Sequence, residues 1–288
     1  MATVGIIGGS GLYQIEGIQD VKEVSLETPF GPPSDAFITG KLDGTSVVFL
    51  PRHGRGHRIS PTEINYRANI WGMKKLGVNA IVSISAVGSL KLQIKPMDFV
   101  LPDQFIDRTA PRRHMTFFTG GIVAHVGLAE PISEKVAEVV YDACEKAGVT
   151  VHKNGVYLNM EGPQFSTKAE SNLYRSWGCD IIGMTNLPEA KLAREAEIDY
   201  CTLAAVTDYD CWHHSHGSVT VEMIIEYLNK NVDNAKKILK IAIPKVGKMK
   251  KFSAEGALKC AIMTAPNFIP EQKKKDLEII IGKYIKCS

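Results

Sequence analysis

A short loop rich in arginine and histidine is the first place in the sequence where side chains gather that could bind a ligand. Residues 51–58 read PRHGRGHR and directly follow the apolar run 47–50. Three arginines and two histidines at the end of a strand would be costly to bury without a negatively charged partner. A guanidinium can bind phosphate through two parallel hydrogen bonds, and glycine lets the backbone approach a ligand closely. The loop therefore predicts an oxyanion site, with a solvent-exposed basic loop as the alternative.

Two other strand ends offer hydroxyl groups and backbone amides to such an anion. Residues 8–11 read GGSG after the apolar run 4–7, and residues 85–89 read SAVGS after the run 80–84. The first turn does not fit a dinucleotide fingerprint, because Gln14 stands where the third glycine is needed, and it does not fit a phosphate loop either. Each turn alone is ordinary, although its backbone amides are suited to an anion.

Two neighbouring carboxylates, Asp208 and Asp210, follow the apolar run 201–206. Burial raises the pKa of a carboxyl group, so one of the pair could serve as a proton donor near neutral pH. The nearby His213, His214 and His216 make a metal site the competing interpretation. Their spacing gives no assured ligand geometry, so we expect no metal.

The composition excludes several classes of protein. With 288 residues, 44% of them hydrophobic and 23% charged, the chain can bury a substantial core. A net charge of +3 is too mild for a nucleic-acid-binding protein. No run of about 18 apolar residues is present that could span a membrane, and no cationic leader precedes Gly8. The six cysteines lack metal-binding spacing, so we expect reduced thiols and a cytoplasmic location.

Strand patterns and helix patterns alternate along most of the chain. Strands are predicted at residues 4–7, 47–50, 80–84, 180–184 and 201–206, and helices at 60–77, 131–147, 167–178 and 218–243. The first helix is expected to begin at Ser60, where Glu63 completes a capping box, and the third at Thr167 with Glu170. The alternation predicts an α/β fold with a parallel or mixed sheet covered on both faces, in which ligands lie beyond the carboxyl ends of the strands.

No internal repeat or domain boundary is visible, so we expect residues 1–288 to form a single domain. A Lys-rich stretch, 245–251, opens a C-terminal extension, 245–288, in which helices are expected. The stretch is typical of a solvated linker. The alternative, a patch that binds RNA or a membrane, is disfavoured because few aromatic residues lie among the lysines.

Taken together, the sequence resembles the methylthioadenosine phosphorylases, within the trimeric purine nucleoside phosphorylase family. The motifs that carry the resemblance lie in family order between Gly5 and Trp212 and read GIIGGSGLY, TPFGPPSDAF, RHGRGH, NYRANIW, SAVGSL, PDQFIDRT, EGPQFSTKAES, GMTNLPEA and TDYDCW. They imply an α/β fold in which a twisted mixed sheet forms a distorted barrel flanked by helices. They also imply no metal and a homotrimer or homohexamer in which a neighbouring subunit completes each active site.

The resemblance implies a role for individual residues. Phosphate would be held by Ser10, Arg52, His53, Ser85, Ala86 and Thr185. The nucleoside would be bound by Met184 under the ribose, Phe165 against the base, and Asp208 and Asp210 at the purine N7 and exocyclic amine. The 5′ substituent would lie near His57 and His125, in an apolar pocket formed by Val221, Ile224 and Ile225. Three separate loops would then form one anion site.

The same resemblance implies phosphorolysis of 5′-methylthioadenosine to adenine and 5-methylthioribose 1-phosphate. Phosphate would be a co-substrate that attacks C1′, no cofactor would be needed, and Asp208 would protonate N7 of the leaving purine. Asp208 and Ser166 favour 6-aminopurines, because related 6-oxopurine enzymes typically carry asparagine and glutamate there. A purine nucleoside phosphorylase or methylthioinosine phosphorylase is the close alternative, and a non-catalytic nucleotide sensor is the remote one.

Overall fold

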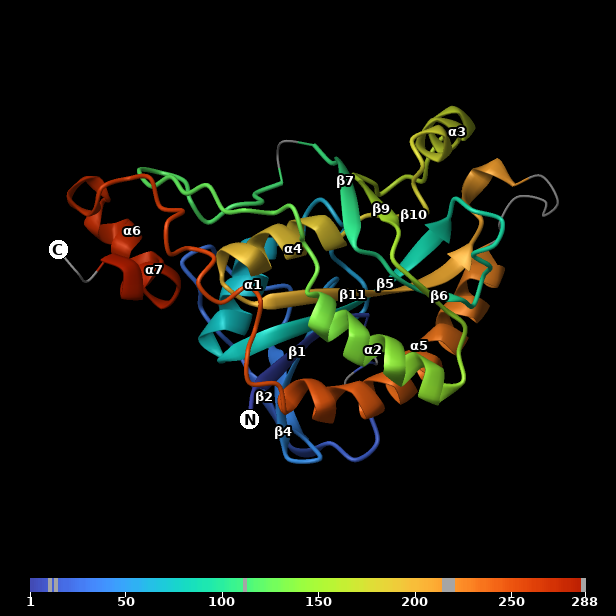
Figure 1. Cartoon of the computed structure of the whole chain (residues 1–288), viewed down its shortest axis with the longest axis horizontal. Helices are drawn as coiled ribbons and strands as arrows, with labels where there is room; N and C mark the ends of the chain where they lie inside the picture. The colour runs from blue at the N-terminus through green and yellow to red at the C-terminus, as the bar shows by residue number, and fades with distance from the viewer. Residues whose placement is uncertain (10–11, 13–14, 111–112, 214–220, 286–288) are drawn as a thin grey trace.

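An eleven-stranded mixed sheet forms the centre of the molecule (Figure 1). The computed structural model describes residues 1–9, 12, 15–110, 113–213 and 221–285, with only the backbone of 221–225 and 228. The strands are β1 (Thr3–Gly8), β2 (Gln19–Val24), β3 (Phe37–Leu42), β4 (Thr45–Pro51), β5 (Val78–Ser89), β6 (Phe99–Leu101), β7 (Gln104–Arg108), β8 (Val151–Lys153), β9 (Val156–Met160), β10 (Ile181–Gly183) and β11 (Asp199–Asp208). The main order is β2-β3-β4-β1-β5-β10-β9-β7, and β11 joins β5 to β6, which pairs with β8. The expected mixed sheet is confirmed, and no pairing among the described strands closes it into a barrel.

Parallel strands bring the predicted chemistry to one edge of this sheet. β1 runs parallel to β4 and β5, and β5 runs parallel to β11. In register, Gly8 pairs with Pro51, and Gly88 pairs with Asp208. The turn after β1, the basic loop after β4 and the acid pair at the end of β11 therefore begin at the same edge. All five predicted strands are present.

Helices cover both faces of the sheet (Figure 1). Their bounds are α1 (Tyr66–Lys75), α2 (Glu134–Ala147), α3 (Lys168–Ser176), α4 (Asn186–Glu195), α5 (Val221–Gly247), α6 (Glu271–Asp276) and α7 (Glu278–Ile285), with short 3-10 helices η1 (Asp210–Trp212) and η2 (Pro266–Phe268). Under the sheet, Val136 and Val140 of α2 and Ile238 and Leu239 of α5 are fully buried in one cluster with strand residues such as Val82. These buried side chains form the inward face of α2.

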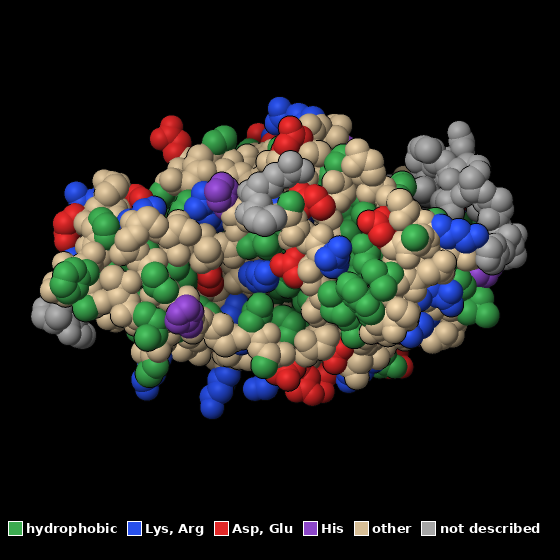
Figure 2. Space-filling view, turned by 90° about the horizontal axis from the view of Figure 1, so that it is seen from above, with side chains coloured by type: hydrophobic (Ala, Val, Ile, Leu, Met, Phe, Trp, Pro, Cys, Tyr) green, Lys and Arg blue, Asp and Glu red, His purple; other side chains and the backbone are tan. Residues whose placement is uncertain are grey.

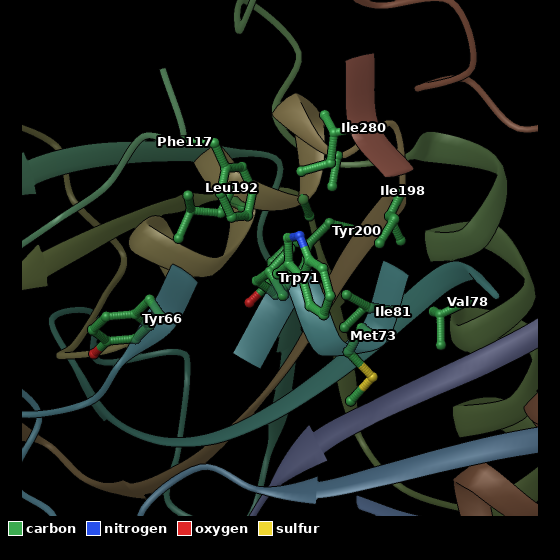
Figure 3. Close-up of a cluster of buried hydrophobic side chains, with 14 of the residues drawn as sticks. Tyr66, Trp71, Met73, Val78, Ile81, Phe117, Leu192, Ile198, Tyr200 and Ile280 are labelled. Carbon is green, nitrogen blue, oxygen red and sulfur yellow. The ribbon is translucent and has the colours of Figure 1, made fainter. Parts of the chain in front are cut away.

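A second cluster of buried side chains lies on the opposite face (Figure 3). It joins Trp71 of α1, Leu192 of α4 and Ile280 of α7 to Ile81 of β5. The Trp71 indole also donates a hydrogen bond of 3.0 Å to the Asp276 carbonyl at the end of α6. Because each large apolar side chain contributes about 1.5–3 kcal/mol when fully buried, the C-terminal helices are held on the same core as α1 and α4.

The predicted start of the first helix at Ser60 was wrong. The Ser60 amide and hydroxyl do donate to the Glu63 carboxylate, at 3.2 and 2.6 Å, but these bonds close only a turn. The helix begins at Tyr66 because Asn65 provides the cap, its side-chain oxygen accepting from the Ala68 amide at 3.1 Å. Two capping residues therefore lie close together in the sequence, and the second one starts the helix.

Two other predicted helix ends agree with the structure, whereas α5 continues to Gly247, four residues beyond the predicted end at 243. Thr167 and Glu170 form the complete capping box of α3, and Gly148 ends α2 in the left-handed conformation, with φ 72°. The long predicted helix is α5, although residues 218–220 of the prediction lie outside the described residues. Beyond Gly247 the C-terminal extension contains η2, α6 and α7, separated by turns.

Candidate active site

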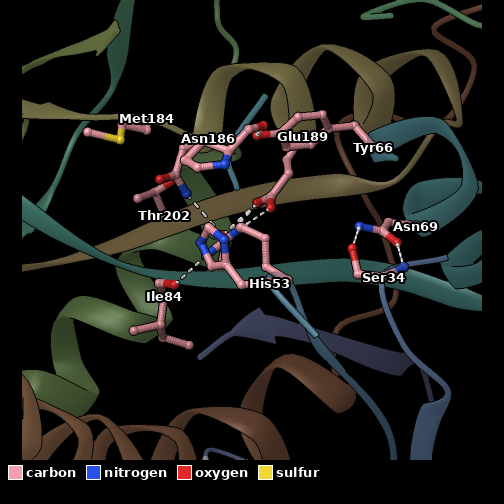
Figure 4. Close-up of polar contacts among 12 residues, drawn as sticks. Ser34, His53, Tyr66, Asn69, Ile84, Met184, Asn186, Glu189 and Thr202 are labelled. Carbon is pink, nitrogen blue, oxygen red and sulfur yellow. Dashed lines mark hydrogen bonds and ion pairs between the residues drawn. The ribbon is translucent and has the colours of Figure 1, made fainter. Parts of the chain in front are cut away.

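Arg52 lies buried directly after β4, and its guanidinium bonds to Ile84 and Glu189, both of which are labelled in Figure 4. It donates to both Glu189 carboxylate oxygens, one of them at 3.0 Å, to the Ser83 hydroxyl, and to the Ile84 carbonyl at 3.0 Å. Four of the five guanidinium N–H groups therefore bond to described residues, and the fifth has no hydrogen-bond partner among them. Hydrogen bonds to both partners are what make a buried ion pair tolerable.

Glu189 of α4 is a residue that the sequence prediction missed. Besides Arg52, its carboxylate accepts hydrogen bonds from the Ser83 and Tyr200 hydroxyls, both at 2.8 Å. The Asn186 side-chain amide donates to the same two hydroxyls, at 3.0 and 2.8 Å. Arg52 and Glu189 are separated by 137 positions, so no local pattern pairs them. The available signal was chemical, since a buried arginine requires an acidic partner and GMTNLPEA contains one.

His53 follows Arg52 and is held in one orientation. Its ring Nδ1 lies 2.8 Å from the Ile59 carbonyl oxygen, and the Ile59 amide donates back to the His53 carbonyl at 3.1 Å. The ring stacks on His57, with centroids 4.2 Å apart and an interplanar angle of 22°. Burial, together with the charge of Arg52, lowers the pKa of His53 to about 4. The imidazole is therefore neutral at physiological pH.

Ser85 and Thr185 are both buried, and each adjoins in sequence a residue of the hydrogen-bond network around Arg52. Ser85 follows Ile84, whose carbonyl Arg52 holds, and Thr185 directly precedes α4. Both lie beside the buried phenol of Tyr157, whose pKa is raised by burial and lowered in part by the Ser85 hydroxyl and the Thr185 backbone. Of the other predicted phosphate-binding residues, Ala86 is exposed at the same strand end, and Ser10 lies outside the described residues.

Asp208 and Asp210 lie over Gly88 of β5. A Cβ atom at Gly88 would stand 3.0 Å from Asp208 Oδ1 and 3.3 Å from Asp210 Cβ, so glycine makes room for the acid pair. The Thr207 hydroxyl and the Asp210 amide donate to the Asp208 carboxylate at 2.8 and 2.7 Å. Burial raises the pKa of both carboxyls, and for Asp210 the charge of Asp208 adds to the rise. The pair can thus hold a proton at higher pH than an ordinary aspartate.

Arg113 is a second residue that the sequence prediction missed. Its buried guanidinium donates to the Met184 carbonyl at 2.6 Å and to the Glu161 carbonyl, and it pairs with the Glu161 carboxylate at 3.0 Å. Gly162, next to Glu161, has a φ of 71°, and a Cβ there would stand 2.5 Å from the Met184 sulfur. The position of Met184, the predicted ribose contact, is therefore set by Arg113 and by a glycine.

Of the remaining predicted site residues, only some lie near the acid pair in the structure. Ser166 is buried, and its carbonyl oxygen accepts from the Cys211 thiol at 3.2 Å, next to Asp210. Phe165 is 70% exposed. The His125 amide donates to the Ala261 carbonyl at 2.8 Å, and among the described residues no hydrogen bond or ring contact joins His125 to the acid pair. The predicted 5′ pocket residues Val221, Ile224 and Ile225 lie on α5, with side chains outside the description.

The described residues also bear on metals and membranes. They contain no group of three histidine, cysteine, aspartate or glutamate side chains that could hold a metal ion, and His214 and His216 lie outside them. Within the described ranges no helix is both long and apolar enough to cross a bilayer. Figure 2 shows one face of the molecule, hollowed near its middle, where acidic and basic side chains lie next to each other.

The fold and the site together define an α/β protein with a buried arginine and an acid pair at strand ends along one edge of the sheet. Residues 3–244 match the phosphorylase superfamily, to which this chain belongs. The S-methyl-5′-thioadenosine phosphorylase of Geobacter sulfurreducens is 56% identical over 282 residues, covering 98% of this chain and 99% of the relative. The C-terminal extension is thus part of what the two proteins share.

Solved structures agree with this assignment. The crystal structure of a methylthioadenosine phosphorylase from an antarctic soil metagenomic library has a TM-score of 0.93 and 48% identity, covering 97% of this chain and 98% of that one. A variant of the Schistosoma mansoni adenosine/methylthioadenosine phosphorylase, in complex with methylthioadenosine, has a TM-score of 0.79 and 37% identity, covering 87% and 93%.

Proposed function

We propose that the chain cleaves 5′-methylthioadenosine by phosphorolysis, releasing adenine and 5-methylthioribose 1-phosphate. The observation that carries the proposal is the position of Asp208 and Asp210 over Gly88, three residues beyond Ser85 on β5. In this proposal a proton donor and an anion site share one strand end. The names of relatives that match nearly the whole chain support the choice of nucleoside.

The chemistry follows from this arrangement. A phosphate oxygen forms a bond to C1′ while the bond from C1′ to N9 breaks, and the bonding electrons move into the purine. A proton passed from Asp208 to N7 neutralises the leaving adenine. Burial raises the pKa of Asp208, which keeps that proton available closer to neutral pH. In this proposal the phosphate is held by Ser10, Arg52, His53, Ser85, Ala86 and Thr185.

The nucleoside would be selected at both of its ends. Asp210 accepts a hydrogen bond from the 6-amino group, which an oxo group cannot donate, and its buried Oδ2 has no partner among the described residues. Ser166 is buried beside it, as the smaller residue expected for adenine. At the 5′ end, Val221, Ile224 and Ile225 of α5 would surround the methylthio group, near His57.

The proposal also covers the oligomeric state, the co-substrate and the cellular location. The exposure of Phe165, at 70%, and the separation of His125 from the acid pair support a homotrimer or homohexamer in which a neighbouring subunit brings His125 to the site. We propose phosphate as the co-substrate, with no metal or other cofactor and no nucleic-acid or membrane partner. Five cysteines are unpaired in the described structure, which supports a cytoplasmic location.

The test is a comparison of adenine release with and without phosphate. The purified chain is incubated with 5′-methylthioadenosine in a phosphate-free buffer, and adenine and sugar phosphate are both quantified. We expect release only when phosphate is added, with one sugar 1-phosphate for each adenine. Equal release in both conditions would identify a hydrolase and contradict the proposal.

The close alternative is a phosphorylase of 6-oxopurine or of a broader set of nucleosides. A panel that crosses 6-amino and 6-oxo bases with 5′-hydroxyl and 5′-methylthio groups separates the two, because our proposal predicts the highest kcat/KM for the 6-amino, 5′-methylthio combination. Ligand binding without any turnover would instead indicate a sensor.

A further inference from the structure

The protonation of His53 sets what its second ring nitrogen can offer. A carbonyl oxygen only accepts hydrogen bonds, so the 2.8 Å contact with the Ile59 carbonyl requires the proton on Nδ1. Burial and the charges of Arg52 and His57 oppose a second proton, and together they outweigh the hydrogen bond to Ile59, which favours it, so the pKa of His53 falls. The neutral ring therefore carries a lone pair on Nε2, which can accept a hydrogen bond but cannot donate one. Stacking on His57 and the bond to Ile59 hold the ring against a flip.

The rest of the anion site offers little positive charge to compensate. The Arg52 guanidinium is paired with Glu189, and this pair is nearly uncharged as a unit. One guanidinium N–H remains, together with the hydroxyls of Ser85 and Thr185, and hydroxyls can donate. In the proposed phosphate site an oxyanion would meet several donors and the fixed acceptor Nε2 of His53.

We infer that this site selects an oxyanion that carries its own proton, with the P–OH group donating to Nε2 of His53. The inference rests on the proposed function only in assuming that these residues form the phosphate site. In mildly alkaline solution phosphate and arsenate are mainly singly protonated dianions, whereas sulfate, of similar size and charge, carries no proton. Phosphate can satisfy the acceptor directly, and sulfate must draw a proton onto His53 from solution.

This difference gives the two anions different pH dependences. With the pKa of His53 near 4, each pH unit above neutrality reduces the protonated fraction of the ring tenfold. Sulfate affinity should fall about tenfold per pH unit from pH 7.5 to 8.5, with uptake of one proton on binding. Phosphate affinity should change by less than about threefold over that range, because the same monoprotonated species binds throughout.

The experiment is calorimetric titration of the full chain with inorganic phosphate, arsenate and sulfate, without nucleoside, at several pH values in two buffers of different ionisation enthalpy. We expect phosphate and arsenate to bind alike and sulfate to bind at least tenfold more weakly at pH 8. Phosphate and sulfate with equal affinity and the same pH dependence would overturn the inference. Because the titration contains no nucleoside, it is independent of turnover. The inference can therefore fail while the phosphorolysis assay succeeds, and it can hold while that assay fails.

A variant tests the residue itself. His53→Gln presents an amide that can turn either its oxygen or its NH2 to the anion, so the preference for phosphate over sulfate should fall at least tenfold and the pH dependence of sulfate binding should disappear. The matched control is His152→Gln, on β8 away from the site. It should keep both the preference for phosphate over sulfate and the pH dependence of sulfate binding. If His53→Gln keeps the selectivity, the inference is wrong. If it does not fold, the pH series on the unchanged chain decides alone.

Discussion

Asp208 is the side chain on which the proposed acid catalysis depends. Burial raises the pKa of its carboxyl, while hydrogen bonds from Thr207 and from the Asp210 amide stabilise the charged form and limit the rise. Asp208→Asn should lower kcat/KM for 5′-methylthioadenosine about 10²-fold or more, because an amide cannot supply the proton. In the unchanged chain we expect kcat/KM to fall at high pH, because Asp208 then loses its proton. In Asp208→Asn this fall should disappear. Steady-state kinetics from pH 6 to 9 measure both.

The control for this substitution is Asp142→Asn, which makes the same change at an exposed position of α2. It should leave kcat/KM and the pH profile unchanged. We also expect Asp208→Asn to gain activity on 6-oxopurine nucleosides relative to 6-amino ones. Kinetics of Asp208→Asn that match the unchanged chain at every pH would remove Asp208 from the mechanism.

At the scale of elements, Gly183 at the end of β10 leaves room for the side chain of Tyr157 on the neighbouring strand β9. A Cβ atom at Gly183 would stand 1.9 Å from the Tyr157 hydroxyl, which itself lies beside Ser85 and the Thr185 backbone. Gly183→Ala should therefore displace the phenol, lower the stability by about 1–3 kcal/mol, and raise the KM for phosphate more than the KM for the nucleoside. Thermal unfolding and initial rates at varied phosphate measure these effects.

A second substitution tests the cause. Tyr157→Phe removes the oxygen that the new methyl group would meet, so the double variant should recover part of the stability lost in Gly183→Ala. Gly127→Ala is the matched control, because a Cβ there would meet nothing within 4 Å. Additive losses in the double variant would show that the hydroxyl is not what Gly183 accommodates.

At this scale, the sequence predicted the features that depend on residues close together in the chain, and it missed those that depend on residues far apart. The strands and the capping box of α3 were predicted correctly because their signals lie within a few residues. The start of α1 was wrong because Ser60 and Asn65 both suit a cap, and contacts elsewhere in the fold decide between them. The basic loop indicated an anion site, but the partner of Arg52, Glu189, comes from a distant helix and could not be located from spacing.

At the scale of the whole molecule, Glu195 connects the chain beyond β7 to the core. It lies at the end of α4 and accepts hydrogen bonds from the Thr116 hydroxyl and the Phe117 amide, both at 2.7 Å. Phe117 is fully buried in the cluster shared by α1, α4 and α7. Burial raises the pKa of the Glu195 carboxyl from 4.5 to about 7, so this connection is sensitive to pH.

The sign of that sensitivity follows from linkage. A carboxyl with a raised pKa binds its proton more tightly in the folded state, so its contribution is fully present below the unfolded pKa of 4.5 and is lost as the pH rises through 7. The shift corresponds to at most about 3 kcal/mol of unfolding free energy. In Glu195→Gln the amide oxygen can accept from the Phe117 amide and the NH2 group can donate to the Thr116 hydroxyl, so both contacts are kept without the charge. The variant should therefore be more stable than the unchanged chain at pH 8 and similar at pH 5. Glu138 is exposed on α2, and Glu138→Gln serves as the control. It should leave the difference in stability between pH 5 and pH 8 as it is in the unchanged chain. Chemical denaturation across this pH range measures it, and parallel stability curves for Glu195→Gln and the unchanged chain would contradict the prediction.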